Sequence, residues 1–328
     1  MGQVERRQFL IATGALFAAP LATWAQQAKK VRVGYLSSNP ASDTQAAIDA
    51  FRMRLRDLGY VENQTLFMEY RYAQGSFGQL PELAAELVQL KVDVIFVYGT
   101  PAALAAKNAT KTVPIVFGGV NDPLTVGLVT NLRRPGGNVT GVTTNNSELS
   151  AKRLSVLKEI VPTVSRVAVL ANPQFKPTSN MLAQMRVVSQ PLAVQLHVLE
   201  ARQPQEISAA FAQMSSLKAD ALVVLPDPWF LSQRTRIVEL AMSGRIPAMY
   251  HLRQYVEVGG LMAYGPTYVE SFQQSAALVD KIVRGASPAD LLIEQPWRYE
   301  LAVNLKAAKA LGLTIPQSVL LRADVVIE

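Results

Sequence analysis

The stretch from Asp93 to Pro123 is the part of the sequence that most constrains the fold. It reads DVIFVYGTPAALAAKNATKTVPIVFGGVNDP, and two apolar runs, Val92–Tyr98 and Pro114–Phe117, flank a helical pattern that begins at Pro101. Short apolar runs bounded by Gly and Pro are typical of strands in a parallel sheet that helices cover on both faces. The stretch therefore predicts a strand–helix–strand unit of an α/β fold.

The turn between the first strand and the helix carries the main functional signal. Thr100 is placed to cap a helix whose first residue is Pro101, a position where proline removes no needed backbone donor. The free N–H groups at the start of such a helix lie at the carboxyl ends of the strands, where open α/β sheets bind their ligands. The same junction recurs after other apolar runs, at Asn39-Pro40, Asn121-Asp122-Pro123, Asn172-Pro173 and Asp227-Pro228.

These junction residues have two interpretations. Each one can be only a helix cap, because Ser, Thr, Asn and Asp are the usual N-cap residues. Together they can instead form a polar rim above the sheets, where a solute would bind. The sequence leaves the choice open for any single residue and favours the rim for the set.

Strand and helix patterns alternate along the chain in two successive runs, separated by a Gly-rich turn at residues 133–138. Such alternation indicates βαβ units, and 328 residues suffice for about two domains. We therefore expect an α/β protein with two Rossmann-like lobes, each built on a parallel sheet. The expected strands are Val31–Leu36, Thr65–Tyr70, Arg166–Ala171, Gln195–Leu199, Ala221–Leu225 and Ile246–Tyr250, and the expected helices are Thr44–Leu58, Gln79–Leu90, Leu149–Ile160, Ser179–Leu192, Glu206–Leu217 and Leu231–Ser243.

The first residues form a targeting segment. A basic start with Arg6 and Arg7 precedes the apolar run Ile11–Leu21, and Thr23-Trp24-Ala25 offers a cleavage site. The apolar run is too short to span a bilayer, so residues 1–25 are predicted to be a signal peptide that directs the protein to the periplasm. The Arg6-Arg7-x-Phe9-Leu10 run resembles a twin-arginine signal, although Glu5 and Ile11 depart from that pattern.

Composition and motifs argue against several classes of function. The chain has no cysteine, which excludes disulfides, thiolate metal sites, a cysteine nucleophile and a lipid-modified cysteine at the mature N-terminus. The formal net charge of +7 is spread over the chain, so no nucleic-acid-binding stripe is expected. The two histidines, His197 and His251, belong to no catalytic motif, and neither a P-loop nor a G-x-G-x-x-G or G-x-S-x-G motif occurs. We expect no enzyme activity, no cofactor and no metal.

Several motifs resemble those of a known family. GTPAALAAKNATKTVPIVF, DPLTVGLVTNLRRPGGNVTGV, Lys152-Arg153-Leu154, RVAVLANP, GGLMAYGP and the tail EQPWRYELAVNLKAAKALGLTIPQSVLLRADVVIE are similar to ABC-transporter substrate-binding proteins of the tryptophan/tyrosine type. The resemblance covers essentially the whole chain after the predicted signal peptide. It implies a solute receptor, without catalytic activity, that binds a small molecule and delivers it to an ABC permease in the inner membrane, and we expect it to be a monomer.

The same resemblance implies a type I periplasmic-binding-protein fold, in which three hinge crossings join two lobes. The crossings are expected near Gly141–Asn145, Gly259–Tyr264 and Leu292–Pro296, with Gly141, Gly259, Gly260 and Gly265 providing freedom to bend. The N-terminal lobe would comprise residues 30–143 and 265–292. The C-terminal lobe would comprise residues 144–264 and 293–328.

The resemblance does not settle the ligand; an amino acid or an aromatic solute is the candidate, because a few members of the family bind aromatic amino acids. An amino acid needs acceptors for its ammonium group, for which Asp227 is the first candidate and Asp122 the second. It needs donors for its carboxylate, for which Gly99 and Thr100 are the candidates. Each candidate could instead serve only as a turn, cap or packing residue. Further candidates are Ser37 and Ser38 as donors, Asn121, Asn145 and Asn172 as polar contacts, and Tyr250 and Tyr264 as rings that stack on the ligand or close over it.

Two other roles are alternatives to transport. Sugar-type repressors use the same two-lobed fold, but they carry a helix-turn-helix where this chain has its predicted export signal, which argues against DNA binding. A periplasmic sensor subunit that reports its ligand to a membrane receptor remains an alternative to delivery.

Overall fold

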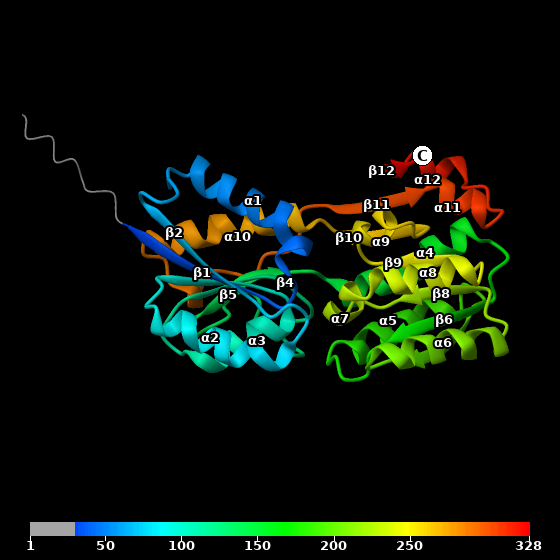
Figure 1. The fold of residues 1–328 in the computed structure, drawn as a ribbon, viewed down its shortest axis with the longest axis horizontal. Helices are drawn as coiled ribbons and strands as arrows, with labels where there is room; N and C mark the ends of the chain where they lie inside the picture. The colour runs from blue at the N-terminus through cyan, green and yellow to red at the C-terminus, as the bar shows by residue number, and fades with distance from the viewer. Residues whose placement is uncertain (1–29) are drawn as a thin grey trace, which may run out of the picture. The chain divides into compact units, whose positions relative to one another are not determined.

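The computed structural model describes residues 30–328, and the predicted signal peptide and twin-arginine run lie outside them. The predicted alternation of strands and helices runs through this whole part of the chain (Figure 1). None of its helices combines the length and the apolar character needed to cross a membrane.

The first sheet has five parallel strands in the order β2-β1-β3-β4-β5. Helices α1 and α10 cover one face, and α2 and α3 cover the other (Figure 1). We call this unit the first lobe. Its strands are β1 (Val31–Ser37), β2 (Leu66–Tyr72), β3 (Val94–Tyr98), β4 (Ile115–Val120) and β5 (Val139–Thr143), and its helices are α1 (Ala41–Asp57), α2 (Leu80–Gln89), α3 (Thr100–Ala109) and α10 (Tyr268–Val283), with short 3₁₀ turns η1 (Phe77–Gln79) and η2 (Pro288–Asp290).

Strand β3 shows why the opening stretch folds as predicted. All five of its residues are buried. Val94, Phe96 and Tyr98 pack toward α1 and α10, whereas Ile95 and Val97 pack toward α2 and α3. The ring of Phe96 stacks on that of Phe51 with 4.4 Å between centroids. A strand covered on both faces needs apolar side chains at every position, which is the pattern that its sequence shows.

The second sheet has seven strands in the order β12-β11-β10-β9-β8-β6-β7, all parallel to their neighbours except the antiparallel pair β10 and β11. Helices α4, α5 and α11 pack on one face, and α6, α7, α8 and α9 pack on the other. We call this unit the second lobe. Its strands are β6 (Arg166–Ala171), β7 (Gln195–Glu200), β8 (Ala221–Val224), β9 (Ala248–Tyr250), β10 (Met262–Pro266), β11 (Tyr299–Asn304) and β12 (Val325–Ile327), and its helices are α4 (Asn146–Ile160), α5 (Thr178–Ser189), α6 (Pro204–Ser216), α7 (Pro228–Ser232), α8 (Arg234–Ser243), α9 (Arg253–Glu257), α11 (Leu305–Ala310) and α12 (Gln317–Leu320).

The chain passes between the two sheets three times. It leaves the first lobe after β5, returns between β10 and α10, and leaves again between η2 and β11. The second passage follows Pro266, later than the expected segment Gly259–Tyr264, because residues 262–266 pair with β11 and their first two residues with β9. The position of the second crossing was therefore predicted incorrectly, by a few residues.

Two glycines near these passages serve close packing. A Cβ on Gly265 would lie 2.0 Å from the carbonyl oxygen of His251, and one on Gly141 would lie 2.2 Å from that of Phe117. Both glycines are inside strands, where neighbouring backbone approaches them. The expectation that they also provide hinge freedom stays a prediction.

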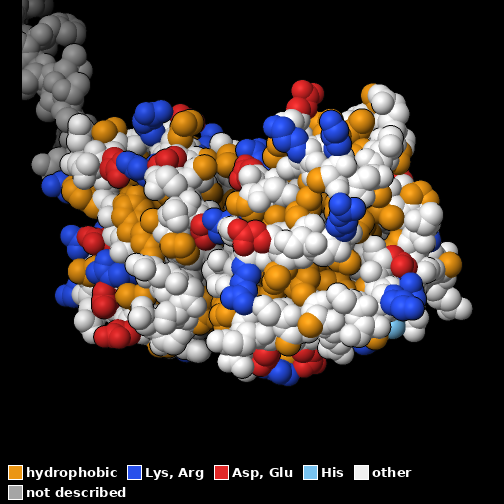
Figure 2. All heavy atoms as spheres, turned by 45° about the vertical axis from the view of Figure 1, so that its right-hand side comes forward, with side chains coloured by type: hydrophobic (Ala, Val, Ile, Leu, Met, Phe, Trp, Pro, Cys, Tyr) orange, Lys and Arg blue, Asp and Glu red, His pale blue; other side chains and the backbone are white. Residues whose placement is uncertain are grey.

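The surface carries mixed charge. On the face drawn in Figure 2, Lys and Arg side chains are interspersed with Asp and Glu side chains. Ion pairs account for part of this mixing, including Arg322 with Glu159 and Arg166 with Asp220.

Candidate functional site

The carboxyl ends of strands from both sheets meet at a small cavity between the lobes. It encloses about 30 Å³, which is room for about one water molecule, so a larger solute can enter only if the lobes separate. We call it the interlobe cavity. It is lined by Asn39, Tyr98, Gly99, Gly119, Asn121, Thr144 and Asn146, which follow or end β1, β3, β4 and β5, and by Pro226, Asp227, Pro228, Leu231, His251, Leu252, Pro266 and Tyr268, which follow or end β8, β9 and β10.

A chain of amide and hydroxyl groups forms one wall of this cavity. The Oδ1 atom of Asn121 accepts hydrogen bonds from Thr144 Oγ1 and from Asn146 Nδ2, the latter at 2.6 Å. The backbone N–H of Asn121 donates to Thr100 Oγ1 at 3.2 Å. All four side chains are buried, so their orientations are fixed by these bonds.

Asp227 of the second lobe also lines this cavity. Its Oδ1 accepts from the backbone N–H of Phe230 at 2.9 Å, which caps α7, and its Oδ2 accepts from Asn172 Nδ2 at 3.1 Å. Burial raises the pKa of its carboxyl group to about 6, because the low-dielectric surroundings disfavour the charged form and the two hydrogen bonds offset this only in part. Asp227 is thus a buried acceptor that faces the cavity.

Among the expected junction caps, Asp227 is the one confirmed by a side-chain hydrogen bond to its helix. The helix after β3 already includes Thr100, and Gly99, with φ of 88°, occupies the N-cap position. Pro40 precedes α1, α5 starts only at Thr178, and the chain after Pro123 forms turns. The cap assignments of Thr100, Asn39, Asn121 or Asp122, and Asn172 were therefore wrong, although Thr100 and Asn172 make other hydrogen bonds at the rim.

The remaining polar candidates lie around the cavity. The hydroxyl of Ser37 closes the turn after β1 through Asn39, and Ser38 is buried beside Gly99. Asp122 accepts from Asn180 of the second lobe, so it joins the lobes at the rim. Asn145 adopts a left-handed conformation, with φ of 54°, just before α4. Their roles in binding stay predictions.

The two predicted tyrosines lie away from the cavity. Tyr250 is fully buried and stacks on Tyr255 at 4.6 Å, and Tyr264 packs against Tyr299 at 6.2 Å. Instead, Tyr98 and Tyr268 line the cavity, and their rings meet edge to face at 4.9 Å. Sequence reasoning missed both, although Tyr98 could have been identified as the last residue of the strand before Gly99-Thr100-Pro101.

Sequence reasoning also missed the role of three further cavity residues. Asn146 and Thr144 immediately follow a strand and belong to the polar wall. His251 follows β9, and burial together with the nearby Arg153 guanidinium holds the pKa of its imidazole well below the usual value. The imidazole is therefore neutral at physiological pH.

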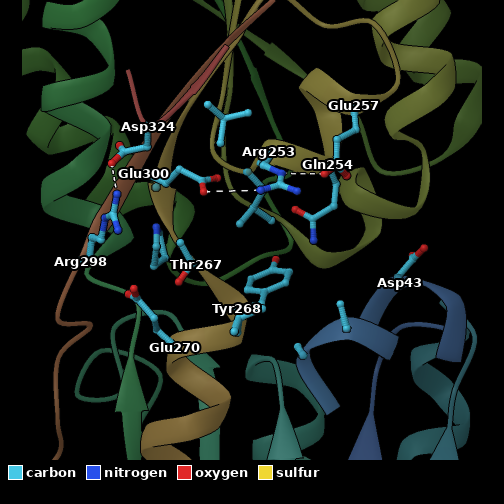
Figure 3. A pocket seen from close by; sticks show the side chains of 17 residues that line it. Asp43, Arg253, Gln254, Glu257, Thr267, Tyr268, Glu270, Arg298, Glu300 and Asp324 are labelled. Atoms are coloured by element: carbon cyan, nitrogen blue, oxygen red, sulfur yellow. Dashed lines mark hydrogen bonds and ion pairs between the residues drawn. The ribbon is translucent and has the colours of Figure 1, made fainter. Parts of the chain in front are cut away.

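A larger hollow, which Tyr268 also lines, lies between α1, α9, α10 and the strands β11 and β12 (Figure 3). Its volume is about 550 Å³, and five carboxylates and two guanidinium groups line it. Most of these charges are paired: Arg253 with Glu257 at 2.7 Å and with Glu300 at 3.8 Å, and Arg298 with Asp324. The interlobe cavity is the candidate solute site because the strand ends of both sheets converge there. Within residues 30–328, no group of three or more His, Asp or Glu side chains is arranged to hold a metal ion.

Comparison with known proteins decides the family. The model of the ABC transporter substrate binding protein family matches residues 30–327. The chain belongs to this family.

The relatives of this substrate-binding protein are similar along nearly their whole length. It is 28% identical, over 301 residues, to a tyrosine-binding protein of Clostridioides difficile strain R20291, a match that covers 89% of this chain and 83% of the relative. A Streptococcus pneumoniae ABC domain in complex with L-Trp is 25% identical, with a TM-score of 0.85, and covers 91% of this chain and 100% of its own. The ligand-free, open structure of a substrate-binding protein with adhesive properties from Clostridium difficile is 24% identical, with a TM-score of 0.70, and covers 90% and 99%.

These similarities confirm the predicted α/β fold with two mainly parallel sheets, of the type I periplasmic-binding-protein class. They also confirm the predicted family. A substrate-binding protein of an ABC transporter takes up a small molecule as its ligand and works with a permease.

Proposed function

We propose that this protein binds an α-amino acid with an aromatic side chain in the interlobe cavity and delivers it to an ABC importer in the inner membrane. The observation that carries the proposal is the arrangement of the cavity walls. Asp227, a buried acceptor, lines the same cavity as Gly99 at the start of α3, the polar residues Asn121, Thr144 and Asn146, and the rings of Tyr98 and Tyr268. The ligands named for two relatives, tyrosine and L-Trp, support the same class of solute.

Each part of an amino acid would then have its own partner. The ammonium group would donate to Asp227, whose carboxylate already accepts from Phe230 and Asn172 and has lone pairs left. The carboxylate would accept from the N–H of Thr100 at the start of α3, where the helix dipole favours negative charge, since the N–H of Gly99 already donates to the carbonyl oxygen of Gly118 at 3.1 Å. The ring would lie against Tyr98 and Tyr268, since aromatic pairs favour edge-to-face or offset contact.

Binding would involve opening and closure of the lobes. A cavity of about 30 Å³ cannot take up an amino acid without separation of its walls. Two polar contacts outside the cavity join the lobes, Arg234 to Asp43 at 2.9 Å and Asn180 to Asp122. The higher TM-score to the L-Trp complex than to the ligand-free open structure, 0.85 against 0.70, supports the view that the lobes are arranged here as in a closed form.

The proposal includes export. Residues 1–25 would act as a signal peptide, by a twin-arginine or general route, and the product would work in the periplasm as a monomer. Delivery to a permease needs different surfaces in the open and closed forms, and a ligand can favour the closed form only by binding it more tightly.

A thermal-shift screen of residues 26–328 tests the proposal. L-Tyrosine and L-tryptophan should raise the melting midpoint, because a ligand that binds only the folded state stabilises it by RT ln(1 + [L]/Kd). D-Tyrosine and a neutral sugar serve as control solutes and should have little effect. If no aromatic amino acid raised the midpoint while another solute class did, the proposed ligand class would be wrong.

A further inference from the structure

The side chain of Arg153 is fully buried in the second lobe, with 0% of the residue exposed. It comes from the middle of α4, and its Nε donates to the backbone oxygen of Tyr264 at 2.7 Å. Its Nη2 donates to Asn146 Oδ1, and its Nη1 has no hydrogen-bond partner within residues 30–328. No carboxylate of this part of the chain forms an ion pair with it.

A buried cation without an anionic partner is costly, and proteins ordinarily pair or neutralise such a charge. Burial lowers the pKa of the Arg153 guanidinium to about 9, which still leaves it protonated at neutral pH. The neighbouring His251 is neutral, so it adds no further charge and supplies no counter-charge. The second lobe therefore holds one uncompensated positive charge close to its carboxyl edge.

This charge lies just behind the wall of the interlobe cavity. Asn146 lines the cavity and accepts from Arg153, and a Cβ on Gly265, the neighbour of the cavity residue Pro266, would lie 3.3 Å from Arg153 Nη2. Because Arg153 holds Asn146 Oδ1, the amide group of Asn146 turns its Nδ2 toward Asn121.

Asn121 extends the hydrogen bonds that begin at Arg153 to the start of α3. Its Oδ1 accepts from Asn146 and its backbone N–H donates to Thr100, so one hydrogen-bonded chain runs from Arg153 to Thr100. Gly99, the residue before Thr100, lines the cavity together with Asp227. The positive charge of Arg153 is thus linked through Asn146 and Asn121 to the start of α3, where the proposed function places the ligand carboxylate.

We propose that Arg153 is a positioning residue that makes the cavity select solutes carrying a carboxylate. It acts through Asn146 and through its own charge, which a ligand carboxylate at the start of α3 compensates. The inference rests on the proposed function, since it takes the interlobe cavity as the solute site. The preferred class is an amino acid with a free carboxylate, over the corresponding amide, amine or polyol.

The test compares L-tyrosine with L-tyrosinamide, and L-tryptophan with L-tryptophanamide, by titration calorimetry. These pairs share the ammonium group and the ring and differ only in the charge of the carboxyl end. In the native protein we expect the acid to bind at least tenfold more tightly than the amide. Arg153→Lys retains the charge and should retain most of this ratio. Arg153→Met should reduce the ratio by about tenfold, as loss of a charge interaction through a partly polar medium would.

The ratio separates an electrostatic role from a merely structural one. If Arg153 only supported the fold, Arg153→Met would weaken acid and amide alike, and an unchanged ratio would overturn the proposal. Arg153→Gln retains a donor for Asn146 without the charge, and it replaces Arg153→Met if the latter does not fold. It should reduce the ratio of acid affinity to amide affinity by the same factor as Arg153→Met.

A failure of the proposed function would look different. If neither amino acid bound the native protein, the proposed ligand would be wrong, whatever the role of Arg153. The pair acetate and acetamide then decides the inference in a thermal-shift assay. A midpoint raised by acetate in the native protein, and not in Arg153→Met, supports it; equal responses of the two proteins overturn it.

Discussion

Arg234 of α8 and Asp43 of α1 form an ion pair across the two lobes, with 2.9 Å between Nη2 and Oδ1. The side chain of Asp43 is only 6% exposed, and that of Arg234 is 24% exposed. The second contact between the lobes, from Asn180 to Asp122, starts from α5, which covers the other face of the second sheet. The two contacts therefore hold the lobes together from both faces of that sheet.

Removal of the ion pair should favour the open form. We expect Asp43→Asn to increase the radius of gyration of the ligand-free protein in solution X-ray scattering and to weaken ligand binding by up to about fivefold, since a partly exposed pair contributes roughly 0–1 kcal/mol. Glu159→Gln breaks the Arg322 ion pair within the second lobe and is the matched control. An unchanged scattering profile in Asp43→Asn would show that the pair does not hold the lobes closed.

The role of Asp227 in binding can be separated from its role as a helix cap. Asn304 caps α11 in the same way, since its Oδ1 accepts from Ala307 N at 2.9 Å, and it is also buried but lies outside the interlobe cavity. Asp227→Ala and Asn304→Ala should each lower the free energy of unfolding by about 0.5–2 kcal/mol. Only Asp227→Ala should also weaken binding of the amino acid, by about one to two powers of ten, through loss of a hydrogen bond to a charged group.

Calorimetry and denaturant unfolding on the two variants measure both effects. Equal loss of affinity in the two variants would mean that stability, rather than contact with the ligand, explains the result. Unchanged affinity in Asp227→Ala would remove Asp227 from the site.

Gly265 shows how closely the second passage between the lobes is packed. A Cβ there would lie 2.0 Å from the carbonyl oxygen of His251, and this is backbone that cannot turn aside. Gly265→Ala should therefore destabilise the protein by more than about 2 kcal/mol, as overpacking of a core does. Gly78→Ala, where a Cβ would meet nothing within 4 Å, is the control and should change the melting midpoint little.

The parts of the fold that the sequence predicted depend on local patterns. The strand at residues 94–98 is buried on both faces, and its five consecutive apolar residues predict this burial. The prediction that Thr100 is the N-cap was wrong because Gly99, which has a positive φ, occupies that position one residue earlier. A Gly-Thr-Pro run does not show whether the helix starts at Thr100 or at Pro101. The cap at Asp227 is confirmed, because Asp followed by Pro leaves its carboxylate as the acceptor for the helix N–H groups, whereas its contact with a ligand stays a prediction.

The parts that could not be predicted depend on contacts between distant residues. Arg153 reads as an ordinary basic residue beside Lys152, and only its contacts with Tyr264, 111 positions away, and with the strand that contains Gly265 reveal that it is buried. Tyr250 ends a strand, as Tyr98 does, and Tyr264 lies near the end of one, but their rings pack in the two cores of the second lobe, against Tyr255 and Tyr299, and do not line the cavity. The hydrophobic pattern of a single strand does not predict which strands will be its neighbours in the sheet.

The pH dependence of binding follows from the pKa of Asp227. Burial raises this pKa from 3.8 to about 6, so the folded protein binds the proton more tightly than the unfolded chain does. The resulting contribution to the free energy of unfolding, about 3 kcal/mol for a shift of about two units, is complete below pH 4 and is lost as the pH rises through about 6. The affinity for an ammonium group changes with pH in the opposite direction: it rises as the pH rises through about 6, because the ionised carboxylate is the form that pairs with the ammonium group.

We therefore expect affinity for the amino acid to be constant above about pH 7 and to fall on acidification, reaching about a tenth of its plateau at pH 5, one unit below the pKa. The ligand's ammonium group stays charged over this range, and the buried His251 stays neutral because its pKa is held low. Calorimetry between pH 5 and 8 measures the profile. Asp227→Asn should bind weakly with no dependence on pH in this window, and an identical acid limb in this variant would assign the titration to another group.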